Sequence, residues 1–288
     1  METKMHSKRA MIFACAVLTS PLAIAEETKL PAGGGIIPEQ RAALAADTVG
    51  RGFGPQSPRD IDMHAGRNHR FFAVAPDATE MSLCDIHFHK NAEHKGGEFT
   101  VSAGTGDGKG FGTGFKYNGK LSEAELKPID KAIGSSQQTS LVPGDTIEIH
   151  FVYSTAKATI GHGLGTCLSS SIKNPQLRVE AVVAVLVNDA NAADFTRMAQ
   201  VKQVGDLNQA PNLPVDLGIP VIYEGSTTGP DYNTKGSPFE VTWRVRPKVV
   251  KVDINSVERW LENNPFSEDH AHGVRNLVVN LDLLSPIE

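Results

Sequence analysis

The sequence predicts a mainly β fold of the α+β class, in which strands dominate and helices are few and short. Many short apolar stretches are rich in Val, Ile, Phe and Thr, and Gly, Pro, Asn or Asp residues separate them. These apolar types favour the pleated surface of a sheet, and the separating residues favour turns. The predicted strands are Arg70–Val74, Ser82–His89, Glu98–Ala103, Thr146–Ser154, Gln176–Asn188, Pro220–Glu224, Phe239–Val245 and Val249–Ile254.

Three stretches repeat their apolar residues at helical spacing and predict short helices. Ser122–Ile133 begins with Ser122 as N-cap and Glu125 three residues later, which is the capping-box pattern. Asn188–Val201 is the second stretch. Asn255–Glu262 is the third, and its apolar side chains fall on one face.

The chain opens with the features of a secretory signal peptide. Basic residues precede an apolar run, Ala10–Leu22, and Ala23-Ile24-Ala25 gives the small-x-small pattern of a cleavage site. The apolar run is too short and too interrupted to span a bilayer. A lipid anchor at Cys15 is the weaker alternative, because the usual Leu three residues before the Cys is missing. We therefore expect cleavage after Ala25 and a secreted, periplasmic protein.

The mature chain is long enough for one large domain. Removal of residues 1–25 leaves 288 − 25 = 263 residues, with 25 Lys and Arg against 32 Asp and Glu, a net charge of −7. Nucleic acid is therefore not an expected partner. Residues 26–50 predict a loosely ordered arm, and 51–288 a single catalytic domain. An excursion at 95–139, rich in Gly, suits a surface hairpin or edge insertion. No later segment predicts a membrane helix, and a homodimer stays open.

Two cysteines, Cys84 and Cys167, remain in the mature chain. In an oxidising compartment two cysteines usually pair, so the sequence favours a disulfide between them. Two unpaired, buried thiols are the alternative.

Three histidines on two predicted strands indicate a metal site. His87 and His89 are two positions apart, so their side chains project from the same face of a strand. His150 on another strand could supply a third nitrogen, and three His with one open position is the layout of a catalytic zinc. Asp85 and Glu148 each precede a histidine by two residues, where a carboxylate can accept the other ring N–H. For the His-x-His pair alone, satisfied core or surface histidines are the alternative.

Four separate stretches resemble segments of the α-type carbonic anhydrases, in the order of that family. Gly54–Ile61 resembles the Gln-Ser-Pro-x-Asp-Ile signature near the start. His87–His94 resembles the His-x-His-x-x-x-Glu-His block, and Glu148–Val152 resembles the Glu-x-His-x-Val strand of the third ligand. Tyr223–Pro230, followed by Glu240–Trp243, resembles the Tyr-x-Gly-Ser-x-Thr-x-Pro and Val-x-Trp segments.

Departures from the α pattern favour the δ class. The excursion at 95–139 is long for an α-type enzyme, Thr227–Pro230 reads Thr-Thr-Gly-Pro where that class has Thr-Thr-Pro-Pro, and Asp269–Arg275 is foreign to it. The chain is identified as a bacterial member of the δ class on an α-like scaffold. The resemblance implies a large, twisted, mostly antiparallel central sheet with zinc on its face and a few short peripheral helices.

The resemblance also implies an activity and the residues that perform it. The enzyme would hydrate CO2 reversibly to bicarbonate and a proton by zinc-bound hydroxide. His87, His89 and His150 would hold the Zn2+ ion. Thr228 would accept the hydrogen bond of the hydroxide, and Glu93 would accept the hydroxyl proton of Thr228.

An apolar pocket for CO2 and a route for the proton complete the expected site. Val152, Val182 and Trp243 match the positions that line the pocket in the family. Thr227 stands where the family usually has a Leu at the pocket wall. A proton shuttle is expected to be a histidine, because imidazole changes charge near neutral pH. The candidates are His64, His69 and His162.

Two other functions stay open from the sequence. His87–Glu93, followed by Pro143–Asp145 and His150, also resembles the cupin pattern, in which all four side chains bind Fe or Mn in an oxygenase or isomerase. That pattern leaves the similarity of Gly54–Ile61 and Tyr223–Trp243 unexplained. A carbonic-anhydrase-like binding module without activity is the other alternative. Such modules typically lose a His ligand, and all three are present here.

Overall fold

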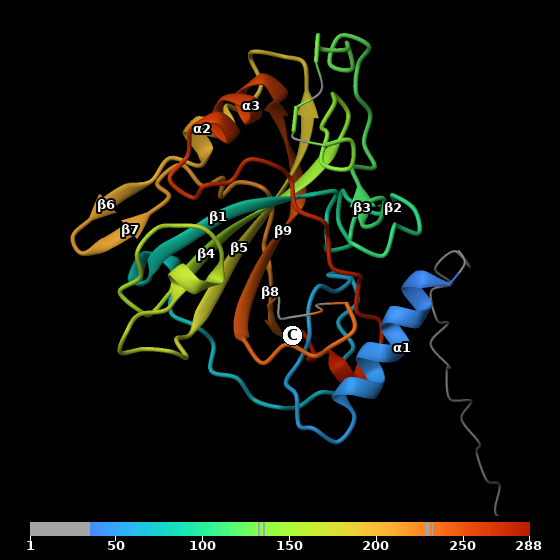
Figure 1. Ribbon diagram of the computed structural model, residues 1–288, viewed down its shortest axis with the longest axis vertical. Helices are drawn as coiled ribbons and strands as arrows, with labels where there is room; N and C mark the ends of the chain where they lie inside the picture. The colour runs from blue at the N-terminus through green and yellow to red at the C-terminus, as the bar shows by residue number, and fades with distance from the viewer. Residues whose placement is uncertain (1–34, 132, 135, 228–230, 232) are drawn as a thin grey trace, which may run out of the picture. The chain divides into compact units, whose positions relative to one another are not determined.

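A computed structural model describes residues 35–131, 133–134, 136–227, 231 and 233–288. At its centre lies a five-stranded sheet with strand order β1-β4-β5-β9-β8 (Figure 1). Three neighbouring pairs are antiparallel, and β5 and β9 run parallel. The predicted mainly β fold with a mostly antiparallel central sheet is therefore confirmed. The strands are β1 (Ser82–Lys90), β4 (Thr146–Ser154), β5 (Leu177–Val187), β8 (Val221–Ser226) and β9 (Glu240–Asp253).

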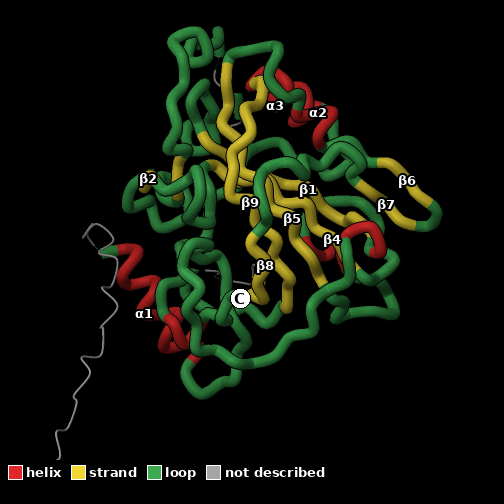
Figure 2. Tube along the Cα trace, turned by 180° about the vertical axis from the view of Figure 1, so that it is seen from behind, coloured by secondary structure: helices red, strands yellow, loops and turns green. Residues whose placement is uncertain are grey.

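The remaining elements are short and surround this sheet (Figure 2). Two small antiparallel ribbons are β2 (Val101–Ser102) with β3 (Phe115–Lys116), and β6 (Lys202–Val204) with β7 (Leu207–Gln209). The helices described are α1 (Ile36–Thr48), α2 (Phe195–Met198) and α3 (Ile254–Glu262), with 3-10 turns η1 (Ala78–Glu80), η2 (Leu164–Cys167) and η3 (Leu281–Leu283). Among the described residues, no helix has the length and apolar character needed to cross a membrane.

The helix predictions succeed once and fail twice. Helix α3 forms as expected, capped by the Asp253 side chain, which accepts a hydrogen bond from the backbone N–H of Asn255. In the second predicted stretch, only α2 is helical, because Ala193, two residues before it, instead bridges to Val252 of β9. Long-range pairing therefore overrides local propensity there.

The stretch Ser122–Ile133 forms turns rather than a helix in its described residues. The capping box itself is made, with the Ser122 N–H 2.7 Å from Oε2 of Glu125. Pro128 follows within two turns, and proline disfavours helical backbone at the residue before it. The capping box that normally begins a helix is therefore formed, but no helix follows it.

Two further expectations near the N-terminus differ from the structure. The expected loose arm contains α1, whose Leu44 is buried with Val278 and Leu284. The Arg41 side chain also donates to the Leu277 carbonyl at 3.0 Å. Arg70–Val74 is not a strand. The signal-peptide assignment of residues 1–25 lies outside the described residues.

One face of the sheet, here called the histidine face, carries His87, His89 and His150. The register places His87 opposite His150 and His150 opposite Ala181. Because side chains alternate along a strand, these residues share one face. Val152, Ala181 and Trp243 belong to one buried apolar cluster on this side.

The opposite face is apolar at one end and charged at the other. Phe88 of β1 packs there against Phe195 of α2 and Trp260 of α3, at ring-centroid distances of 5.5 and 6.0 Å. At the other end lie four charged side chains, which we call the arginine face: Arg178, Glu180, Arg244 and Arg246.

The disulfide favoured by the sequence is present between Cys84 of β1 and Cys167 of η2. Both residues are fully buried. The bond joins β1 to the loop that leads into β5 across a sequence separation of 83 residues. For a loop of that size, the chain-entropy model allows roughly 4–5 kcal/mol of stabilisation.

Candidate metal centre

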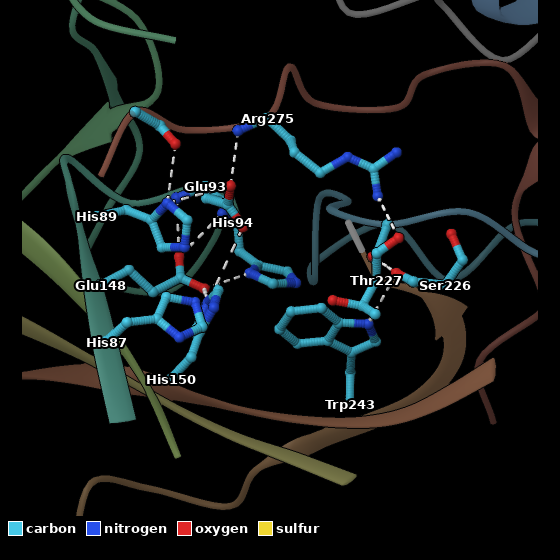
Figure 3. A network of polar contacts seen from close by, with 12 residues as sticks. His87, His89, Glu93, His94, Glu148, His150, Ser226, Thr227, Trp243 and Arg275 are labelled. Carbon is cyan, nitrogen blue, oxygen red and sulfur yellow. Dashed lines mark hydrogen bonds and ion pairs between the residues drawn. The ribbon is translucent and has the colours of Figure 1, made fainter. Parts of the chain in front are cut away.

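Three histidines from two adjacent strands bring their ring nitrogens together. His87 and His89 come from β1 and His150 from β4 (Figure 3). One nitrogen of each ring lies within 4.8 Å of the other two. The ring centroids are 4.7 to 5.2 Å apart. This spacing allows a single metal ion to be shared.

The His89 ring has its orientation fixed by a backbone carbonyl. Its Nδ1 lies 2.9 Å from the carbonyl oxygen of Gly273. A carbonyl can only accept, so Nδ1–H donates and Nε2 keeps its lone pair. Burial and the charges of His150 and His87 hold the pKa of His89 well below its ordinary value. Among the described residues, Nε2 of His89 is buried without a hydrogen-bond partner, which leaves a lone pair for a cation.

Carboxylates hold the other two rings. Nδ1 of His87 lies 2.7 Å from Oδ2 of Asp85, and Nε2 of His150 lies 2.8 Å from Oε1 of Glu148. An ionised carboxylate accepts, so these outer nitrogens donate, and Nε2 of His87 and Nδ1 of His150 are left for a metal. Burial lowers the pKa of His150 to about 4. Burial also acts to lower the pKa of His87, but the charge and hydrogen bond of Asp85 outweigh it and raise that pKa.

The Glu148 carboxylate is the central acceptor beneath these rings. Oε1 accepts from His94 Nδ1 at 2.6 Å and from His150 Nε2 at 2.8 Å. Oε2 accepts from the backbone N–H groups of Glu93 and His94 at 2.8 and 3.0 Å. Burial acts to raise the pKa of Glu148, but the charge of His94 and the histidine hydrogen bonds hold it well below its ordinary value. Glu148 therefore ties the segment after β1 to β4.

His94, Glu148 and His150 form a second group with metal-ligand spacing. His94, however, has both ring nitrogens engaged, because its Nε2 lies 2.7 Å from the Tyr223 hydroxyl. The Trp243 ring packs 4.9 Å from the His94 ring and 5.0 Å from the His150 ring. With its donors and acceptors satisfied internally, this group supports the first one rather than offering a second metal site.

Glu93 lies behind the three rings rather than among their free nitrogens. Its Oε1 accepts from the Arg275 N–H at 2.6 Å and lies 3.5 Å from Nδ1 of His89. Its Oε2 is 3.9 Å from Nε2 of His150. Both histidine atoms are the outer nitrogens. Burial and the charge of Glu148 raise the pKa of Glu93 to about 7.

Thr228, the expected partner of Glu93, lies outside the described residues. Its neighbour Thr227 is buried, and the Thr227 carbonyl accepts from Arg275 Nη1 at 3.2 Å. Ser226 accepts from the Trp243 indole N–H through its carbonyl at 3.4 Å. The chain that enters residue 228 is thus fixed on the histidine face (Figure 3).

The expected CO2 pocket needs one correction. Val152 and Trp243 lie on the histidine face, but Val182 does not. Register places Val182 opposite Ile149, and both belong to the apolar cluster on the other side of the sheet. Ala181 is the β5 residue opposite His150. The sequence interpretation selected its neighbour Val182, whose side chain points to the other face of the sheet.

Among the three shuttle candidates, His162 has contacts that lead to the centre. His64 and His69 are exposed residues of the 61–70 segment. Nδ1 of His162 lies 3.1 Å from Oε1 of Glu268, and Oε2 of Glu268 lies 2.5 Å from Nε2 of His272. The His272 ring is 5.4 Å from the His87 ring. The His162 side chain is 62% exposed, so it reaches solvent.

The C-terminal segment completes the centre through backbone atoms. His272 runs beside β1, donating its N–H to Phe88 and accepting from Lys90 with its carbonyl, both at 2.9 Å. Gly273 and Arg275 then contribute the carbonyl to His89 and the N–H to Glu93. Sequence reasoning missed these roles, because a backbone group leaves no side-chain signature. The stretch 269–275 was nevertheless visible as one that departs from the α pattern.

Comparisons with known proteins bear on this centre. Residues 78–256 match the family model described as delta carbonic anhydrase. No curated protein is significantly similar to the chain. Solved structures that are similar include an α-carbonic anhydrase from Thermovibrio ammonificans in complex with sulfanilamide, 18% identical, covering 82% of this chain and 88% of that one, with a TM-score of 0.29. Another is the α-carbonic anhydrase of Photobacterium profundum, 14% identical, covering 84% and 93%, with a TM-score of 0.27.

Proposed function

Because the chain belongs to the delta carbonic anhydrase family and is a carbonic anhydrase, we propose that it hydrates CO2 reversibly to bicarbonate and a proton with zinc held by His87, His89 and His150. The observation that carries the metal assignment is the buried, unpartnered Nε2 of His89. Its lone pair is fixed by the Gly273 carbonyl and is directed to the two neighbouring imidazoles. Such an acceptor needs a donor or a cation, and the two other imidazole nitrogens within 4.8 Å favour the cation.

The three rings suit zinc because each has one nitrogen that can bind a cation, and three such ligands would leave a fourth coordination position for water. When bound, zinc supplies a Lewis acid that lowers the pKa of water to about 7 and so provides a nucleophile for CO2 at neutral pH. Asp85, Gly273 and Glu148 hold the rings in the required tautomers. Such outer partners are worth about 10–100-fold in metal affinity or activity.

Glu93 and Thr228 would orient the reacting oxygen. Glu93 is buried and fixed by the Arg275 N–H, so it can accept a proton from a hydroxyl on the 226–230 segment. A threonine that donates to Glu93 must accept from its other neighbour. This polarity would direct a lone pair of the nucleophile toward CO2.

The pocket for CO2 would be formed by Val152, Ala181 and Trp243. All three are buried on the histidine face. An apolar wall suits a small nonpolar substrate and excludes competing water. The proton released by the reaction would leave through His162, which Glu268 orients at the surface.

A cupin-type site is not favoured by this geometry. In that site Glu93 would be a fourth ligand, whereas its oxygens lie 3.5 and 3.9 Å from the outer nitrogens of His89 and His150. An inactive binding module is also disfavoured, since all three ligand candidates converge. Export to the periplasm is supported by the buried Cys84–Cys167 disulfide, which forms and persists in oxidising compartments.

The test is CO2 hydration by stopped flow together with metal analysis of the purified mature chain. We expect about one zinc per chain and a rate that a chelator abolishes and added zinc restores. Iron or manganese in place of zinc, with no CO2 hydration, would instead support the cupin function. A full zinc complement without activity would indicate a binding module.

A further inference from the structure

The arginine face buries more positive than negative charge. Glu180 accepts from Arg178 Nε at 2.8 Å and from Arg246 Nη2 at 2.7 Å, and lies 3.6 Å from Arg244 Nη1. Asp77, more than half exposed, lies 3.9 Å from Arg178. Three guanidinium groups thus meet two carboxylates, one of them at the surface.

The pairing of β5 with β9 brings these four charged side chains together. Arg178 and Glu180 alternate along β5, and Arg244 and Arg246 alternate along β9, the parallel neighbour. Residues two apart on a strand project side by side from one face. The register sets Glu180 opposite Arg244, so one carboxylate stands between two arginines of the next strand.

Several N–H groups of this cluster have no acceptor. Six buried side-chain polar atoms lack a hydrogen-bond partner in the part of the chain that the structure describes. Three of the six are Nε of Arg244 and Nε and Nη1 of Arg246. The Arg246 side chain is only 1% exposed. Arg178, by contrast, also donates to the carbonyls of Ala75 and Pro76 at 3.2 and 3.1 Å.

A guanidinium group cannot escape this situation by losing its proton. Burial lowers the pKa of Arg246, and Glu180 opposes that effect, but an arginine pKa lies so far above neutrality that the charge remains. A buried charge with open donors is stabilised by an acceptor of opposite sign. The Arg244 side chain is 31% exposed and provides the approach from solvent.

We propose that Arg244 and Arg246 form a binding site for a small planar oxyanion of the carboxylate type, on the opposite face of the sheet from the metal centre. The open N–H groups belong to two neighbouring guanidinium groups, so the two oxygens of one carboxylate can each accept from a different arginine, whereas a halide ion offers a single acceptor atom. Bicarbonate has this chemistry. The site does not depend on the proposed zinc centre.

The test is thermal unfolding of the full mature chain in bicarbonate at constant ionic strength, with chloride as the comparison anion. A ligand at 100 times its Kd should raise Tm by roughly 5–10 °C through mass action. The same shift is expected after the metal has been stripped with a chelator. Persistence of the shift in metal-free protein separates this site from binding at the histidines.

Two variants assign the site. Arg246→Met removes both open donors of Arg246 at similar volume, and Arg244→Gln changes the partly exposed arginine, whose loss the fold tolerates more easily. Both should lose the bicarbonate shift, and Arg244→Gln alone decides the question if Arg246→Met does not fold. Arg67→Gln is the matched control, because Arg67 pairs with Asp282 where both side chains are more than 60% exposed. It should keep the full shift.

Three results would overturn the proposal. The first is an absence of any bicarbonate shift in the wild-type chain, as expected if water satisfies the open donors. The second is an equal shift with chloride, which would contradict recognition of a planar oxyanion. The third is an equal shift in Arg244→Gln and Arg67→Gln, which would place the anion elsewhere.

Discussion

On the histidine face, burial leaves His89 and His150 as neutral rings, whereas on the arginine face three guanidinium groups keep their charge. The pKa of His89 is held well below its ordinary value and that of His150 falls to about 4. An imidazole can shed its proton when water is removed, and a guanidinium cannot. Both faces are left with buried polar atoms that lack a partner.

The difference determines which ligand each face suits. Nε2 of His89 offers a lone pair beside two further imidazoles, and this arrangement suits a cation. Arg246 offers N–H groups on a fixed positive charge, and these suit an anion. The same sheet therefore presents complementary sites on its two sides, and the protonation chemistry of the side chains sets the sign of each.

The largest expected effect is the loss of metal and activity when the histidine face loses one of its proposed ligands. His89→Ala removes the orphan lone pair, so metal content should fall from about one ion per chain to near zero. CO2 hydration should fall to background, a loss on the order of 10⁶-fold. Metal analysis and stopped flow measure both. His270→Ala, a nearby partly exposed histidine, serves as the control and should keep its zinc.

Removal of the central carboxylate of the arginine face should lower the free energy of unfolding. Glu180→Gln removes the central carboxylate and leaves three guanidinium groups against exposed Asp77 alone. Loss of one partner from a buried ion pair costs about 3–5 kcal/mol. Urea unfolding measures the change. Glu180→Gln with wild-type unfolding free energy would show that water already neutralises this face.

Acid should destabilise the metal-free protein through the histidine face. In the unfolded chain His150 takes up a proton below about pH 6.5, whereas in the folded chain it does so only near pH 4. The unfolded state therefore binds more protons between these values, and stability falls as pH falls, by roughly 3 kcal/mol in total. Urea unfolding in a chelator at several pH values measures the slope. In His150→Gln the slope should be shallower.

Thr228→Ala should lower kcat/KM by on the order of 10²-fold, the scale of one positioned active-site hydrogen bond. Zinc content should not change, because Thr228 is not among the proposed ligands. Glu93→Gln should act through the same hydroxyl, so the double variant should be little worse than the worse single variant. Loss of metal from Glu93→Gln with full activity in Thr228→Ala would contradict this arrangement.

The smallest effect is expected at the rim of the histidine face. His162→Ala should lower kcat by less than the ~10²-fold typical of direct acid–base catalysis, because dissolved buffer can also carry the proton. kcat/KM and zinc content should stay near wild type, and added imidazole should restore kcat. Equal losses in kcat and kcat/KM without rescue would indicate a structural role instead.

The sequence by itself determined the elements that depend on local spacing. His87 and His89 share a face because a strand has a period of two, and Asp85 and Glu148 meet their histidines for the same reason. Strand content and helix α3 follow from the same short-range periodicities. The Cys84–Cys167 pair was favoured by the sequence, because these are the only two cysteines after residue 25.

Tertiary structure decided whatever depends on register or on backbone atoms. Ala181, not Val182, stands opposite His150, because the pairing of β4 with β5 sets the parity of β5. Gly273 orients His89 through a carbonyl that every residue type possesses. The arginine face exists only because β5 and β9 lie side by side in parallel, although more than 60 residues separate Glu180 from Arg244 in the chain. Such long-range pairings follow from the packing of the whole sheet, which local spacing does not encode.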